Sequence, residues 1–209
     1  PVAEVWFDGY CGEGPNGRKQ EYEWNSYYEL VRRFQPEAVI AISGPDVRWV
    51  GNENGLARES EWSVLPLPLS EGELAGVSRG ETSLDMVFRP LNLMGEDLGS
   101  REKILQARAL FWYPAEVDVS IRPGWFYHQS QDNQVKSGLE LFNIYLQSVG
   151  RNSVLLLNVP ADRRGLLADN DIKVLQEFRR LVAKSFKKNL ADRARIKASQ
   201  TAAGHNIEA

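Results

Sequence analysis

Short apolar runs alternate along the chain with longer stretches in which apolar residues recur at every third or fourth position. The short runs predict four strands, over residues 3–7, 38–43, 117–121 and 153–159. The longer stretches predict three helices, over residues 25–34, 138–149 and 170–186. Strands that alternate with helices are typical of an α/β fold with a parallel sheet and crossover helices.

Local signals predict where these helices begin and end. Pro36 cannot continue the first helix, so that helix is expected to close just before it. Gly150 follows the second helical stretch and predicts its C-cap. Asp169 or Asn170 predicts the N-cap of the third helix.

Residues 56–110 have a different composition, rich in Ser, Glu, Gly and Pro with short apolar islands. We expect a long insertion without regular structure, and the interleaved Trp62, Phe88 and Met94 favour a loop packed near a site. From residue 198 onward no core pattern is found, which predicts a linker or a frayed end.

The length of 209 residues, the net charge of −3 and the 43% of apolar residues are typical of one globular domain or part of one. No apolar run approaches the roughly 20 residues that a membrane helix needs, and the first residues lack a signal-peptide pattern. The acidic balance argues against nucleic acid as the main partner. Residues 179–197 are basic, and we interpret them as the solvated face of a helix.

Cysteine and histidine are scarce in this sequence. Cys11 is the only cysteine, so an internal disulfide is excluded, and with only His128 and His205 beside it a zinc cluster is not expected. We therefore predict neither a metal nor another cofactor.

Asp8 lies where the first predicted strand runs into a glycine-rich turn. In parallel barrels the residues that perform chemistry stand at the C-terminal ends of strands, so Asp8 is a candidate catalytic carboxylate. Asp before Gly is also common in turns, and a capping role stays open on position alone.

Several blocks, in a fixed order, carry a family resemblance. They are residues 5–9 (VWFDG) with 12–14 (GEG), 44–53 (GPDVRWVGNE), 114–128 (PAEVDVSIRPGWFYH), and 148–152 (SVGRN) running into 155–160 (LLLNVP). Together they resemble the α-L-fucosidases of glycoside hydrolase family 29, and most closely the subfamily that removes α-1,3- or α-1,4-linked fucose from branched, Lewis-type glycans.

The resemblance implies a retaining hydrolase with Asp8 as the nucleophile and Glu53 as the acid/base. The two acids are 45 positions apart, which lets them stand on neighbouring strand ends. Retention requires carboxyls about 5–5.5 Å apart, with the acid neutral and the nucleophile ionised at the start. We therefore expect burial beside Trp49, or the negative charge of Asp8, to keep Glu53 neutral, and hydrogen-bond donors around its turn to keep Asp8 ionised.

Five further residues are predicted to bind substrate: Trp6, Trp49, Glu116, Arg122 and Trp125. Glu116 is also a rival acid/base. Arg122 and Trp125 belong to a segment that in the family lines the fucose pocket; alternatively they form a buried ion pair and a core tryptophan. Trp6 and Trp49 are expected to wall the cleft, although core packing would also explain them. His128 is assigned no chemistry.

Two features of the family are missing from the sequence. The histidines that bind fucose hydroxyls in this family lie upstream of the nucleophile, and the C-terminal β-sandwich has no counterpart here. We therefore expect the C-terminal half of a (β/α)8 TIM barrel over residues 1–188, without its N-terminal strands, and a linker over 189–209 toward another domain.

The expected partners are a fucosylated oligosaccharide and the N-terminal half of the barrel. A glycan-binding fragment without activity and a structural half-barrel are the alternatives. The substrate class implies an extracellular or periplasmic location.

Overall fold

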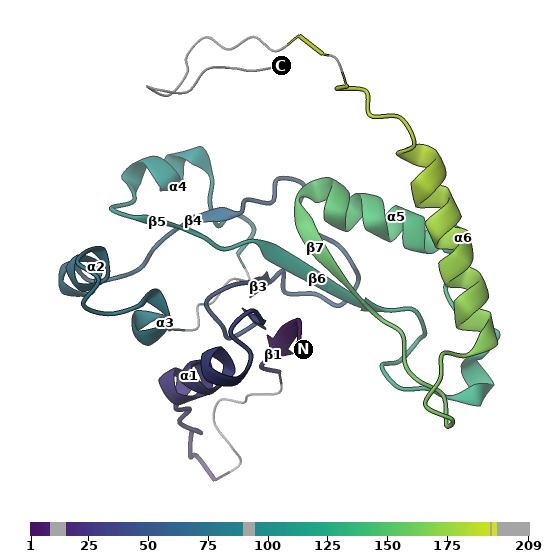
Figure 1. Ribbon diagram of the computed structural model, residues 1–209, viewed down its shortest axis with the longest axis horizontal. Helices are drawn as coiled ribbons and strands as arrows, with labels where there is room; N and C mark the ends of the chain where they lie inside the picture. The colour runs from purple at the N-terminus through teal and green to yellow at the C-terminus, as the bar shows by residue number, and fades with distance from the viewer. Residues whose placement is uncertain (9–15, 90–94, 193, 196–209) are drawn as a thin grey trace.

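The computed structural model describes residues 1–8, 16–89, 95–192 and 194–195. Its main strands are β1 (Glu4–Trp6), β2 (Val39–Ala41), β3 (Arg48–Trp49), β6 (Ala115–Ser120) and β7 (Ser153–Asn158). β1 pairs with β2, and β6 lies between β3 and β7. Every one of these pairings is parallel, and an isolated parallel bridge from Ala41 to Val47 links β2 to the segment entering β3 (Figure 1).

The four strands expected from the apolar runs are present, each with slightly different ends. β6 begins at Ala115, before the predicted start at 117, and β2 ends at Ala41 because Ile42 takes a positive φ of 66°. β3 was missed. It has two residues, between a Gly-Pro-Asp turn and Gly51, which is too short to show a periodic pattern.

The three predicted helices are also present. α1 (Trp24–Phe34) follows β1 and buries Tyr28, and its chain leaves the helix at Gln35, before Pro36. α5 (Gly138–Ser148) begins with a capping box in which Ser137 and Glu140 satisfy each other's backbone N–H groups. α6 (Asp169–Ser185) packs on α5, and both helices lie on the same side of β6 and β7 (Figure 1).

Two predicted caps are wrong. Gly150 does not cap α5, because the chain continues from Val149 into the 3-10 turn η2 (Val149–Arg151), and Asn152 takes the left-handed conformation instead. The N-cap of α6 is Ala168, which places the carboxylates of Asp169 and Asp171 in the first turn, where the helix dipole favours negative charge. A second 3-10 turn, η1 (Gln129–Gln131), precedes α5.

The prediction of an irregular insertion over residues 56–110 is also wrong. This segment holds β4 (Val64–Pro66), paired antiparallel with β5 (Leu110–Trp112), and three short helices between them. The helices are α2 (Glu71–Ser78), α3 (Leu84–Val87) and α4 (Arg101–Gln106). None is long enough for a sustained apolar stripe, and two of them are fixed by local serine caps instead.

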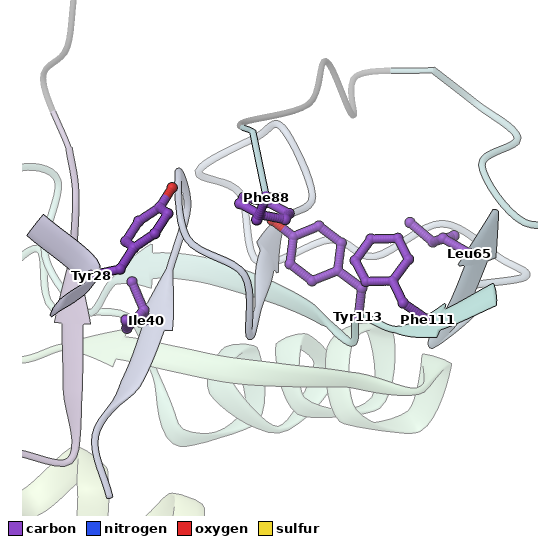
Figure 2. Packing of buried hydrophobic residues seen from close by; sticks show 6 residues of the cluster. All are labelled: Tyr28, Ile40, Leu65, Phe88, Phe111 and Tyr113. Carbon is purple, nitrogen blue, oxygen red and sulfur yellow. The ribbon is translucent and has the colours of Figure 1, made fainter. Parts of the chain in front are cut away.

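An aromatic core joins this segment to the strands. Figure 2 shows Tyr28 and Ile40 on one side and Phe88, Phe111, Tyr113 and Leu65 on the other, all at most 7% exposed. The Tyr113 hydroxyl donates to the Gly44 carbonyl at 2.7 Å, which ties the segment to the loop after β2. Phe88 is thus packed as expected, whereas Trp62 is 43% exposed and Met94 lies outside the described residues.

The side chains of β6 alternate in chemistry. Ala115, Val117 and Val119 face one side, where Ala115 and Val117 form a second core with Val50, Ala57 and Leu155. Glu116, Asp118 and Ser120 face the other side, and all three are also buried. One face of the parallel strands is therefore apolar and covered by helices, and the other carries the polar groups.

Candidate active site

A cleft of about 600 Å³ opens on the polar face, at the C-terminal ends of the parallel strands. Asp8 reaches it from the end of β1, Glu53 from the loop after β3, and Asp118 from β6. The remaining lining residues are Trp6, Trp125, Phe126, Leu156, Leu157, Asn158 and Val159. The structure thus brings Asp8, Glu53, Trp6 and Trp125 together, four of the seven predicted site residues.

The two proposed catalytic carboxylates are both exposed. Glu53 accepts a hydrogen bond from the Trp125 indole nitrogen at 3.3 Å. The expected burial of Glu53 is wrong for this chain, because β3 ends at Trp49 and Glu53 stands in the loop beyond it. The glycine-rich turn over 9–15, expected to supply donors to Asp8, lies outside the described residues.

Three tryptophans on this face share one arrangement, in which the indole N–H donates to a carboxylate. The pairs are Trp6 with Glu116 at 2.8 Å, Trp49 with Asp118 at 2.6 Å, and Trp125 with Glu53 at 3.3 Å. A hydrogen bond at the nitrogen fixes the plane of each ring while leaving its apolar face available. Trp49 is not part of the cleft lining, and it touches the cleft through Asp118.

The carboxyl group of Asp118 interacts with both of the proposed catalytic acids. Burial raises the pKa of its carboxyl, and the negative charges of Glu53 and Asp8 raise it further, while the hydrogen bond from Trp49 acts in the opposite direction. The cleft therefore holds three carboxyl groups, and Asp118 interacts with both of the others.

Glu116 lies deeper on the same strand, 2% exposed. Burial raises its pKa to about 8, the Trp6 hydrogen bond opposes this rise, and Glu4 and Asp118 add to it. The carboxyl is thus neutral over most of the physiological pH range. It lies outside the cleft lining and contacts the cleft through Trp6.

Arg122 does not reach the cleft. Its side chain is fully buried and forms ion pairs with Asp171 at 3.0 Å and Asp132 at 2.9 Å. The guanidinium also lies 4.8 Å from the centre of the Tyr127 ring. Of the two alternatives for Arg122, the structure shows the buried ion pair. Its guanidinium group already binds the carboxylates of Asp171 and Asp132.

Asp118 and Asn158 line the cleft and were not among the predicted site residues. Asn158 donates to the Trp125 carbonyl and to the Ser120 hydroxyl, each at 3.0 Å, and so fixes the backbone beneath Trp125. The alternation Glu-Val-Asp-Val-Ser along β6 was the available signal for Asp118, because it places three polar side chains on one face of a buried strand.

Within the described part of the chain, no group of three or more His, Cys, Asp and Glu side chains is placed to hold a metal ion. Cys11 and His205 lie outside that part, and His128 is exposed. No helix among the described residues is both long and apolar enough to cross a membrane.

Comparisons with known proteins connect this arrangement to one enzyme family. No family model matches the chain. Alpha-L-fucosidase 1 of Arabidopsis thaliana is 38% identical over 199 residues, which is 95% of this chain and 34% of that protein. The crystal structure of a putative alpha-L-fucosidase from Bacteroides ovatus superposes with a TM-score of 0.72 at 51% identity, over 90% of this chain and 31% of that one.

A Ruminococcus gnavus GH29 fucosidase solved in complex with fucose has a TM-score of 0.61 and 26% identity, over 90% of this chain and 35% of that one. The chain therefore spans about a third of the length of the relatives that it matches. Across that third, in sequence and in fold, the chain is similar to α-L-fucosidases, among them a fucosidase of glycoside hydrolase family 29.

Proposed function

We propose that this chain supplies the catalytic carboxylates of a retaining α-L-fucosidase. One observation carries the proposal: Asp8 and Glu53, from the ends of β1 and β3, line a single cleft together with two tryptophans. Two carboxylates flanking one sugar site are what hydrolysis of a glycosidic bond requires. The relatives named above are fucosidases, and one of them was solved with fucose bound.

In the proposed reaction, the Asp8 carboxylate attacks the anomeric carbon as the bond to the leaving oxygen breaks. Glu53 gives its proton to that oxygen, and a fucosyl ester forms on Asp8. Glu53 then takes a proton from water, the water oxygen attacks the anomeric carbon, and Asp8 is released as a carboxylate. Trp6 and Trp125 offer apolar ring faces to the C–H groups and the methyl group of fucose.

We further propose that the substrates are α-1,3- or α-1,4-fucosylated, branched glycans of the Lewis type. Such glycans are displayed outside cells, so an extracellular or periplasmic location accompanies this substrate class. These finer assignments depend on the sequence blocks at 44–53 and 114–128, which resemble the subfamily with that linkage preference.

The active form, in this proposal, is a complete (β/α)8 barrel to which an upstream half contributes. The polar face of β7 presents Val154 and Leu156, which are 46% and 36% exposed. Parallel strands seldom leave apolar side chains to solvent, so another element is expected to cover them. The upstream half would also bring further polar groups to the rim of the cleft and bury Glu53.

The test is fucose release by the chain combined with the upstream half of the barrel, from α-1,3- and α-1,4-fucosylated oligosaccharides. Asp8→Asn and Glu53→Gln should each lower kcat by about 10³-fold, since each removes a group that acts in the transition state. Glu29→Gln, at an exposed position of α1, is the matched control and should leave kcat unchanged. Full turnover by either cleft variant would contradict the assignment, and binding of the oligosaccharide without release by the unmodified protein would favour a glycan-binding role.

A further inference from the structure

Two glutamates from strands that are not neighbours meet beneath the cleft. Glu116 of β6 is buried, and its Oε1 accepts the Trp6 indole N–H at 2.8 Å. Glu4, two positions before Trp6 on β1, faces the same carboxyl group. Its own Oε1 is inaccessible to solvent and has no hydrogen-bond partner among the described residues.

The charges around this pair are negative. Asp118 lies two residues along β6 on the same face, and β7 carries no ionisable residue. The cation on β3, Arg48, pairs in register with Ala115, so it lies on the opposite face, where it binds Glu61 and the Tyr113 carbonyl. Two adjacent carboxylates without a cation cannot both stay ionised, and one proton is retained between them.

We propose that Glu116 is a positioning residue: its protonated carboxyl donates to Glu4 while accepting from the Trp6 indole, and so holds Trp6 against the cleft. This inference rests on the proposed function only in that Trp6 lines the fucose site. The raised pKa of Glu116, about 8, agrees with the geometry. The role differs from acid/base chemistry, because the proton stays within the pair throughout the reaction.

A pH dependence follows from this arrangement. When the shared proton is lost at alkaline pH, the two carboxylates repel each other and the support of Trp6 weakens. Trp6 contacts the sugar and not the bond that breaks, so KM for the fucoside should rise while kcat changes little. The midpoint should lie near the pKa of Glu116, about pH 8.

Two variants separate this role from a merely structural one. Glu116→Ala removes the acceptor of the Trp6 indole N–H and should raise KM about tenfold, the loss expected for one buried hydrogen bond. Glu116→Gln can still donate an N–H to Glu4 and accept from Trp6, so it should restore most of this loss and abolish the alkaline rise of KM. Glu29→Gln, at an exposed site on α1, should behave as the unmodified protein does.

Two spectroscopic measurements test the Glu4–Glu116 pair on the chain itself, without any turnover of substrate. Infrared spectra at pH 7 should show a protonated carboxylic acid that disappears in Glu116→Gln, and tryptophan fluorescence should titrate with a midpoint near pH 8 that the same variant lacks. These signals with no fucose release would uphold the pair and reject only the proposed activity. Absence of the carboxylic acid band, or a hundredfold loss of kcat in a folded Glu116→Gln protein, would overturn the inference.

Discussion

Carboxyl groups hold the indoles of three tryptophans in and beside the cleft. Trp6, Trp49 and Trp125 come from three different segments, and each is held by one acid. Because a tryptophan ring contacts a sugar through its face, the acid that fixes the indole nitrogen also fixes the sugar's position. We therefore propose that some acids of this site act on the substrate through an indole.

Asp118→Ala removes the acceptor of the Trp49 indole N–H and a carboxyl group that interacts with both Asp8 and Glu53. We expect kcat/KM for a fucoside to fall about tenfold or more, as for the loss of a hydrogen bond to a charged group. Asp118→Asn, which keeps an oxygen acceptor, should lose less. Equal losses in the two variants would show that the charge, and not the hydrogen bond, matters.

The pKa of Glu116 also predicts how stability changes with pH. The folded-state pKa of about 8 lies above the ordinary value of 4.5, so between these pH values the folded chain binds more protons than the unfolded chain. The free energy of unfolding should therefore fall as pH rises from about 4.5 to about 8, and level off above that. Glu116→Gln should flatten this slope in denaturant titrations, and an unchanged slope would contradict the raised pKa.

At single positions, the sequence was most informative where a residue follows a clear strand. Asp8 follows a strong apolar run and Glu53 falls within a long family block, and both line the cleft. Arg122 has the residue type for sugar binding, yet it forms a buried ion pair with Asp171, 49 positions away along the chain. Such a partner is set by how α6 packs, which no local pattern encodes.

The loop that carries Glu53 is anchored on α5 through Gly55. Gly55 has a φ of +73°, and a Cβ there would lie 2.6 Å from Cγ2 of Ile144. Gly55→Ala should therefore cost about 3 kcal/mol of unfolding free energy, combining backbone strain with overpacking.

Gly165→Ala is the matched control for this prediction. Gly165 has a φ of +76°, but a Cβ at this position would meet no described atom within 4 Å, so only the backbone strain, about 1 kcal/mol, applies. Chemical denaturation of both variants provides the measurement. Equal losses would mean that the contact with α5 does not constrain the loop.

The ion pair of Arg122 joins the end of β6 to the first turn of α6. Arg122→Met would leave Asp171, which is fully buried, without its main cation, and should lower the unfolding free energy by about 3–5 kcal/mol. Replacing both residues, as Arg122→Met with Asp171→Leu, should recover much of this loss. A folded and stable Arg122→Met protein with a large rise in KM would contradict this structural role and would indicate that Arg122 binds the substrate.

Among the elements, those with long periodic patterns were predicted and those stabilised by a few local contacts were not. The apolar runs of β6 and β7 and the stripes of α5 and α6 were found within two residues of their ends. No pattern of sufficient length marks β3, which has two residues, or the short helices α2–α4. Serine side chains cap α2 and α4, and the C-cap of α3 is Phe88, which lies in the aromatic core.

The parallel strands of the described residues form two sheets, β1-β2 and β3-β6-β7, which the bridge from Ala41 to Val47 joins. Helices cover one face of β6 and β7 and the cleft opens on the other, and the chain covers 34% of the Arabidopsis relative and 31% of the Bacteroides structure. The length of the chain and its strand-helix alternation made an α/β fold predictable, whereas closure into a barrel stays a part of the proposal.

The central claim, that Asp8 is the nucleophile of a retaining fucosidase, is tested most directly by trapping its covalent intermediate. The chain combined with the upstream half of the barrel would be incubated with a 2-deoxy-2-fluoro-fucosyl donor, digested and analysed by mass spectrometry. We predict one fucosyl adduct per chain, located on the peptide containing Asp8 and absent from Asp8→Asn. An enzyme that releases fucose without forming this adduct, or that carries it on another carboxylate, would contradict the account.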